Sequence, residues 1–122
     1  MSTLKVDTIQ DTNAVEMYLC KAWVTFNPDA GAIGASGNVT SITDVAAGTT
    51  DINFSITFSD INYAVVCGGN QFNDTAMRYI GPTGYSSEKS TTSVRIYHGY
   101  YSGSSGSLYD YSNYSHHVAV FR

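Results

Sequence analysis

The feature that most constrains the fold is a strict two-residue alternation of apolar and polar residues over positions 51–58. Ile, Phe, Ile and Phe at positions 52, 54, 56 and 58 alternate with Asp, Asn, Ser and Thr. This period is typical of a β-strand with one face in a core and the other in water. Residues 59–62 supply Asp and Asn for a turn, and a mostly apolar run over residues 63–67 ends at Gly68. The pattern predicts an antiparallel β-hairpin over residues 50–68.

Further short strands are predicted on both sides of this hairpin. Residues 21–27 place Ala22, Val24 and Phe26 on one face and Trp23 on the other. Strands are also expected at residues 39–45, 76–80, 93–98 and 117–121, with turns at 46–48 and 81–84 and a connection of small residues at 30–37. Short strands separated by Gly, Pro and Asn turns, without a sustained helical period, predict an all-β fold, an antiparallel β-sandwich.

The segment before residue 21 has a different character. Leu4 and Val6 alternate with polar neighbours and predict a strand over residues 4–10. This strand has no expected local partner, because residues 14–20 suit a short helix as well as a strand. Since an unpaired strand edge is unfavourable, we expect it to pair either with a distant strand or with another chain, and we favour another chain. The chain is therefore divided into an N-terminal attachment segment or stem, residues 1–20, and a β-sandwich head domain, residues 21–122.

Trp23 is the only tryptophan, and it is expected on a face that is otherwise polar, together with Lys21 and Thr25. Two interpretations stay open. The indole either covers an edge of its own sandwich or is buried between subunits, where large amphipathic rings are enriched.

Composition argues against several classes of function. Charged residues make up only 13% of the chain, the formal net charge is −4, and no basic cluster occurs, which disfavours nucleic-acid binding. No apolar run approaches the roughly 20 residues of a membrane helix, so we expect no insertion into a membrane. The first residues lack the pattern of a signal peptide, so we expect the protein to be assembled in the cytoplasm. Cys20 and Cys67 are too few for a disulfide framework and are interpreted as free, small core residues.

One stretch, residues 100–115, departs from the strand pattern. It consists almost wholly of Tyr, Ser, Gly, Asn and Asp and holds half of the ten tyrosines. Such a mixture supplies rigid aromatic rings and adaptable hydrogen bonds, as binding loops do; the alternative is a surface loop whose tyrosines fold back on the sheet. Long loops without structure of their own are usually functional, which favours binding. The predicted receptor-binding residues are Tyr100, Tyr101, Tyr109, Asp110, Tyr111, Asn113 and Tyr114.

No catalytic or metal-binding motif is found in the sequence. The three histidines are His98, His116 and His117, and the adjacent pair is expected on opposite faces of a strand. No nucleophile elbow, phosphate loop or carboxylate pair accompanies them. A histidine on a threefold axis could bind an ion, but a hydrogen-bonded structural histidine is the favoured interpretation. We therefore expect no enzymatic activity, no cofactor and no metal.

Several blocks in order along the chain resemble a known family. MSTLKVDTIQDT (residues 1–12), KAWVTFN (21–27), VTSITD (39–44), residues 58–66 and VAVFR (118–122) are together similar to small tail-fibre proteins of tailed bacteriophages, particularly those that infect cyanobacteria and other marine bacteria. The resemblance implies a trimeric component of the virion tail whose outer domain meets the host surface. The family often carries a Gly/Ser-rich spacer after the first strand, where this chain has VEMYL (15–19), and residues 70–115 show no resemblance.

These observations lead to three hypotheses. The preferred one is a bacteriophage tail-fibre protein, a homotrimer that joins other tail or baseplate proteins and binds a host surface polysaccharide. The second is a purely structural component of the baseplate or fibre network, without a receptor of its own. The third, an enzyme that trims surface polysaccharide, lacks the carboxylate pair that glycoside hydrolysis requires.

Overall fold

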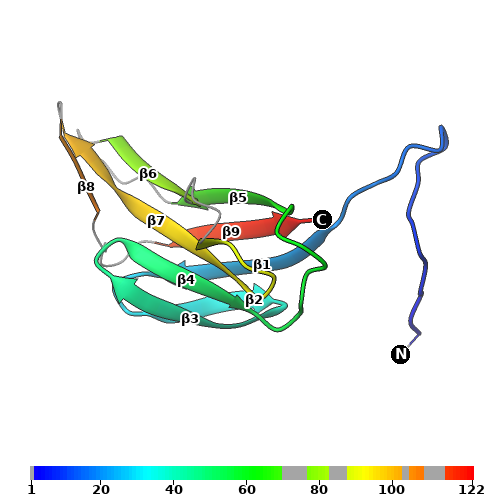
Figure 1. Cartoon of the computed structure of the whole chain (residues 1–122), viewed down its shortest axis with the longest axis horizontal. Coiled ribbons are helices and arrows are strands. Elements are labelled where there is room, and N and C mark those ends of the chain that lie inside the picture. Colours follow the sequence, from blue (N-terminus) through cyan, green and yellow to red (C-terminus); the bar gives the residue numbers. More distant parts are fainter. Residues whose placement is uncertain (1, 70–76, 83–87, 103–104, 109–114) are drawn as a thin grey trace.

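The structure, a computed structural model, describes residues 2–69, 77–82, 88–102, 105–108 and 115–122 (Figure 1). Nine strands occur among these residues, and no α-helix does. In chain order they are β1 (Cys20–Asn27), β2 (Ala32–Gly37), β3 (Val39–Ala46), β4 (Thr49–Phe54), β5 (Ala64–Gly69), β6 (Met77–Pro82), β7 (Ser93–Ser102), β8 (Ser105–Leu108) and β9 (His116–Phe121). No helix in the described ranges is long and apolar enough to cross a membrane.

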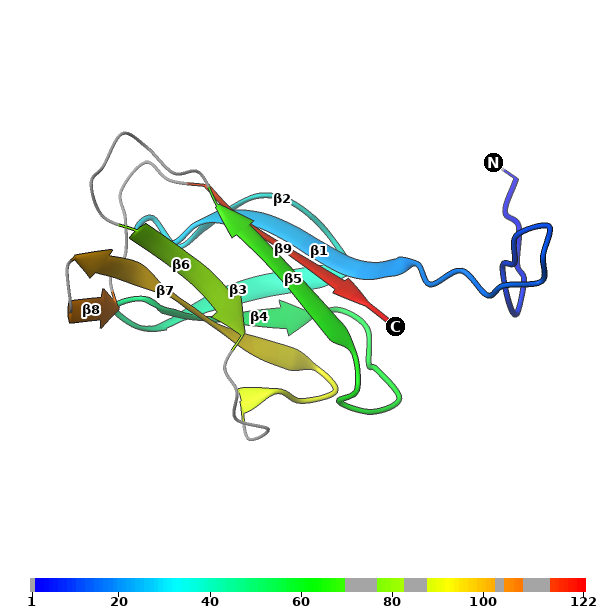
Figure 2. The same cartoon turned by 90° about the horizontal axis from the view of Figure 1, so that it is seen from above.

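The strands form two antiparallel sheets (Figures 1 and 2). The first sheet has the order β2-β1-β9-β5, and the second has the order β3-β4-β7-β6, with β8 paired to β7. Every pair of neighbouring strands is antiparallel. The expectation of an all-β, antiparallel fold is confirmed, and the two sheets are consistent with a β-sandwich.

A shared core holds the two sheets together. Ala22, Val24 and Phe26 of β1 are at most 1% exposed, as the alternation predicted. Every second residue of β4, β7 and β9 joins them, because side chains at positions i and i+2 of a strand lie on one face. The buried apolar core consists of Ala22, Val24, Phe26, Ile52, Phe54, Phe58, Tyr63, Val94, Ile96, Val118 and Val120.

The predicted hairpin over residues 50–68 is wrong. β4 ends at Phe54 and pairs with β3 and β7, whereas β5 pairs with β9 in the other sheet. The residues between them carry the chain from one sheet to the other, and Phe58 and Tyr63 are buried there with ring centroids 4.7 Å apart. A crossing segment that fills the core keeps the same buried pattern as a hairpin, so the alternation could not distinguish the two.

The small-residue run at residues 30–37 is also not a plain connection, because β2 lies within it and pairs with β1. Its outward positions must be small. A Cβ atom at Gly37 would lie 2.4 Å from Nε1 of Trp23, and one at Gly34 would lie 3.1 Å from Oγ1 of Thr25. The strand therefore lacks the large side chains by which strands are recognised in a sequence.

Residues 2–19 form an N-terminal arm that extends away from the sheets (Figure 1). The predicted strand over residues 4–10 is absent; instead the arm folds back on itself through an isolated bridge between Gln10 and Glu16. Asp11 closes the turn, since its Oδ1 accepts hydrogen bonds from the N–H groups of Asn13 (2.8 Å) and Val15 (3.0 Å), and these bonds lower the pKa of its carboxyl. The arm thus has a local partner, and residues 14–20 contain no helix.

Two further expectations need correction. Cys20, where β1 begins, is exposed rather than part of the core, whereas Cys67 is partly buried against it; both thiols are free. Residues 100–115 are not one loop, because β7 runs to Ser102 and β8 covers Ser105–Leu108. The composition rich in Tyr, Ser and Gly concealed a hairpin whose strands have few large aliphatic side chains.

Candidate functional site

The molecule has two unlike ends. At one end, here called the distal end, Gly69 pairs with His116, Met77 with Tyr101, and Ser102 with Ser105. These strand ends flank residues 70–76, 103–104 and 109–114. The arm and Arg122 lie at the other end of the molecule (Figures 1 and 2). These strand ends therefore lie away from the end where the arm leaves the sheets.

The structure places two of the predicted receptor-binding residues at the distal end. Tyr100 pairs with Arg78 and Ser107, and Tyr101 pairs with Met77 and Gly106, so both belong to β7. The other five predicted residues lie outside the described part of the chain: Tyr109, Asp110, Tyr111, Asn113 and Tyr114.

Two buried histidines join the sheets beneath the distal end. His98 of β7 is 0% exposed, and its Nε2 lies 3.1 Å from Oγ1 of Thr50. Its ring is 4.9 Å from that of His116 of β9, which also meets Phe26 at 5.6 Å. His117 is exposed on the opposite face of β9, as predicted. The geometry of His98 and His116 is that of a packed contact between sheets.

The outer face of the first sheet is mostly apolar. In one row across the sheet, Trp23 pairs with Ala119 and Ala119 with Val66; in the next, Thr25 pairs with His117. Trp23 and Val66 are 42% and 58% exposed. We call the outward residues of the three strands β1, β9 and β5 the apolar face; they are Lys21, Trp23, Thr25, Ala64, Val66, Gly68, His117, Ala119 and Phe121.

Two shallow hollows follow this face. One, of about 370 Å³, is lined by the backbone and side chains around Trp23, Val66 and His117. The other, of about 320 Å³, continues toward the arm and is lined by Tyr18, Asn62, Ala64, Phe121 and Arg122. Sequence reasoning identified the outward Trp23 but missed Val66 and Ala119, because their position beside Trp23 depends on strand pairing.

The outer face of the second sheet carries a charged network instead. Nε and Nη2 of Arg95 donate to the two carboxylate oxygens of Asp51, at 2.7 and 2.9 Å. Glu88 lies 3.8 Å from Nη1 of Arg95 and accepts a hydrogen bond of 2.8 Å from the Tyr97 hydroxyl. The hydrogen bond to Asp51 is the main reason why the pKa of Arg95 is raised, and that to Glu88 raises the pKa of Tyr97. We call this surface the polar face.

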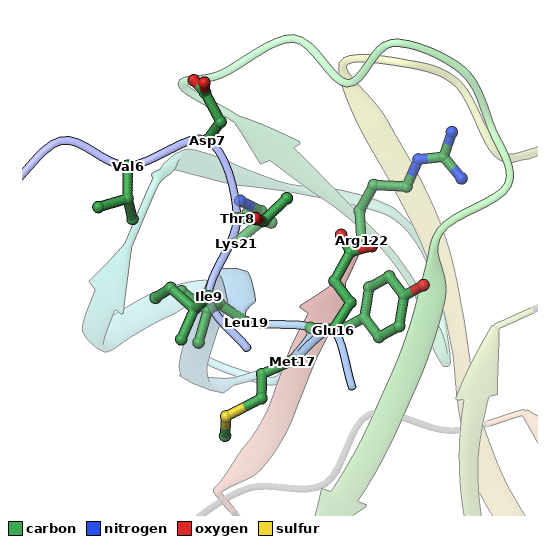
Figure 3. Close-up of a pocket in the computed structure, with 10 residues that line it drawn as sticks. Val6, Asp7, Thr8, Ile9, Glu16, Met17, Leu19, Lys21 and Arg122 are labelled. Carbon is green, nitrogen blue, oxygen red and sulfur yellow. The ribbon is translucent and has the colours of Figure 1, made fainter. Parts of the chain in front are cut away.

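A third hollow lies where the arm meets the first sheet (Figure 3). Its volume is about 140 Å³, and it is lined by both legs of the arm together with Lys21 and Arg122. Most of the arm side chains around it are apolar, among them Ile9 and Leu19, and two, Asp7 and Glu16, are acidic. Arg122 also forms an ion pair with Asp60. The base of the arm thus lies beside the end of the first sheet, whereas the rest of the arm extends away from it.

Within the described ranges, no group of three or more His, Cys, Asp and Glu side chains could hold a metal ion. Comparisons of the chain with protein-family models, with curated proteins and with solved structures find no match. The candidate functional surfaces are therefore argued from their geometry: the distal end, the apolar face and the arm.

Proposed function

We propose that the protein is a non-enzymatic bacteriophage tail-fibre protein, a homotrimer on the virion tail that binds a host surface polysaccharide through its distal end. One observation carries the proposal: the strand ends that flank the tyrosine-rich residues 109–114 converge at the end opposite the arm. An arm that attaches at one end leaves the other end free to reach a receptor. The resemblance to tail-fibre proteins agrees with this division.

The chemistry of the tyrosine-rich segment suits a sugar. Tyrosine rings offer flat apolar surfaces, and Asp110 and Asn113 would provide acceptors and donors for hydroxyl groups. Tyr109 and Tyr111, two residues apart, would share one side if extended. A weak single site is sufficient, because several linked copies raise the avidity by about 10²–10⁴ without new contacts.

The test is adsorption of the purified protein to a panel of cyanobacterial and other marine bacterial strains. We expect the wild type to adsorb to its host and a variant with Tyr109, Tyr111 and Tyr114 replaced by Ala to lose adsorption while remaining folded. A matched control replaces Thr43 and Val45, exposed on β3, by Ala. Equal adsorption by the folded tyrosine variant would place the site elsewhere, and residues 70–93 would be examined next.

The second candidate is a structural component of the baseplate or fibre network. The extent of exposed apolar surface on the arm and on the apolar face favours it, because such surfaces suit contacts with other proteins. It predicts that antibodies label the protein on virions although the purified protein adsorbs to no strain. Release of reducing ends from host polysaccharide would instead support the enzyme that we consider least favoured.

A further inference from the structure

The arm exposes far more apolar surface than its small size can bury. Its large apolar side chains range from 39% exposed for Ile9 to 85% for Leu4. A segment held by one isolated bridge and one turn has no core in which to place them. Exposed apolar clusters of this kind mark surfaces that are covered in an assembly. The exposed residues are Leu4, Val6, Ile9, Val15, Met17, Tyr18 and Leu19.

The apolar face is shaped to receive such a segment. Its outward positions alternate between the large Trp23 and Val66 and small residues such as Ala64, Gly68 and Ala119, which leave the shallow hollows described above. Polar groups that could orient a small ligand are few. Oγ1 of Thr25 already accepts a hydrogen bond of 3.2 Å from the backbone of Ala35. The hollows therefore suit apolar side chains better than a sugar.

Charge complementarity points to the same pairing. The arm, residues 2–19, contains Lys5 against Asp7, Asp11 and Glu16, which gives +1 − 3 = −2. The outward positions of β1, β9 and β5 contain Lys21 and His117 and no acidic residue. An acidic, apolar arm thus meets an apolar face on which the one charged outward side chain, Lys21, is basic.

The direction of the chain argues against a return of the whole arm to its own face, where only Tyr18 at its base lines a hollow. The arm leaves the start of β1 pointing away from the sheets (Figures 1 and 2). To cover the face of the same copy it would have to reverse near Cys20, yet no Gly, Pro, Asn or Asp stands between Val15 and Trp23. These are the residues that tight reversals favour most strongly. We infer that the arm of one copy lies on the apolar face of a second copy.

This exchange deepens the proposed function and rests on the homo-oligomer named there. It assigns Trp23 to the interior of an interface and gives the arm its function in assembly. Each copy both donates an arm and accepts one, so the contact is repeated around a closed ring.

The first test compares Val66→Asp with Val45→Asp. Both valines are exposed on strands, 58% on the apolar face and 43% on β3 of the second sheet. We expect Val66→Asp to raise the dissociation constant of the assembly by about tenfold or more, because it places a carboxylate in an apolar contact with an acidic arm. Val45→Asp should leave it unchanged. Sedimentation at a series of concentrations measures both, and circular dichroism checks that each variant folds.

A variant in the arm keeps the test decisive if Val66→Asp fails to fold. Met17→Asp alters a side chain outside both sheets that is 52% exposed. It should weaken assembly to a similar extent and leave the thermal transition of the dissociated chain in place. Unchanged assembly in Met17→Asp and Val66→Asp would overturn the inference, and so would a wild-type chain that is monomeric at micromolar concentration.

Photo-cross-linking identifies the occupant directly. A benzophenone is attached through Val66→Cys in a Cys20→Ala background. Burial raises the pKa of the partly buried Cys67 thiol to about 11, which slows its reaction with the label, and peptide mass spectrometry verifies that the label is at position 66. In assemblies that mix isotope-labelled and unlabelled copies, we expect cross-links from position 66 to residues 2–19 of a different copy. The same probe at position 45 should give none. Cross-links only within one copy, or to another part of the second copy, would overturn the inference.

Neither measurement involves host cells, so the two proposals fail separately. If copies are cross-linked to one another but the protein adsorbs to no strain, the arm exchange is supported and receptor binding is contradicted. If the protein adsorbs but gives no such cross-links, receptor binding is supported and the arm exchange is contradicted.

Discussion

The outer faces of the two sheets differ although both belong to short antiparallel strands of one chain. On the polar face, Arg95, Asp51, Glu88 and Tyr97 bind one another, and the side-chain amide of Asn53 donates to Ser41 and Thr43. On the apolar face, Trp23 and Val66 meet mostly small residues and solvent. The charged groups of the polar face bind one another within a single chain, whereas the large apolar side chains of the apolar face remain exposed to solvent.

This difference shows where an assembly can form with least cost. Covering the polar face would remove water from charged groups that are already paired, and such desolvation is expensive. Covering the apolar face removes mostly apolar area from water, at a gain of about 25 cal/mol per Å² of apolar surface. The outer face of the first sheet is therefore the side on which a protein contact would cost least. Three predictions test how far the two sheets differ.

The largest effect is expected where the sheets do not differ, in the shared core. Phe26→Ala in the first sheet and Ile96→Ala in the second each empty a site that is at most 1% exposed. Each should lower the free energy of unfolding by about 2–5 kcal/mol, because a cavity remains. Chemical denaturation at one fixed protein concentration measures this. Two separate transitions in either variant would show that one sheet survives alone and would contradict a common core.

An intermediate effect is expected at Tyr63, which links the sheets at the end near the arm. Its hydroxyl donates to the backbone carbonyls of Ser90 (2.8 Å) and Ser93 (3.0 Å), and burial raises its pKa to about 12. In the unfolded chain the pKa is near 10, so the folded state holds the proton longer. This contribution to stability is complete below pH 10 and is lost as the pH rises through 12. The loss in the free energy of unfolding is about 2 kcal/mol at most.

The measurement is the midpoint of denaturation between pH 9 and pH 12 for the wild type and for Tyr63→Phe. The variant loses the hydrogen bond that the hydroxyl shares between the carbonyls of Ser90 and Ser93, so it should be less stable at neutral pH, but its stability should fall less steeply in alkali. Parallel curves for the two proteins would contradict a buried, protonated Tyr63. The comparison cancels the titration of the other tyrosines and of Cys67.

The smallest effect is expected on the polar face. Asp51→Asn removes the charge that Arg95 binds, but both side chains are about a quarter exposed, so we expect a loss of no more than about 1 kcal/mol, reduced further by salt. Asp44→Asn, on exposed β3, serves as the control and should have no effect. Neither variant should change the assembly measured by sedimentation. Dissociation of the Asp51→Asn assembly would show that the polar face is also an interface.

Alternation in the sequence located the core but not the partners of the strands. Ala22, Val24 and Phe26 were predicted inward and Trp23 outward, because the two-residue period depends only on local geometry. Whether the chain turns back or crosses to the other sheet after Phe54 depends on contacts across the whole fold. Ile56, Phe58 and Tyr63 pack into or against the core in either case, so the sequence predicted the wrong pairing.

The candidate surfaces also have a part that local sequence patterns predicted and a part that depends on strand pairing. Composition pointed to residues 100–115, and the structure adds that their strands end away from the arm, which no local pattern could indicate. The apolar face was visible in the sequence only as Trp23; Val66 and Ala119 belong to it through the register of β1, β9 and β5. Strand β2 escaped recognition because Gly37 must be small beneath the indole.

The position of Trp23 also gives the molecule a built-in spectroscopic reporter. With one indole in the chain, resting over Gly37 on the apolar face rather than in the core, tryptophan emission responds to what lies on that surface. Loss of the β-sheet signal in circular dichroism follows the backbone instead. On dilution, a red shift of the emission with an unchanged circular dichroism spectrum would separate dissociation from unfolding in a single unlabelled sample.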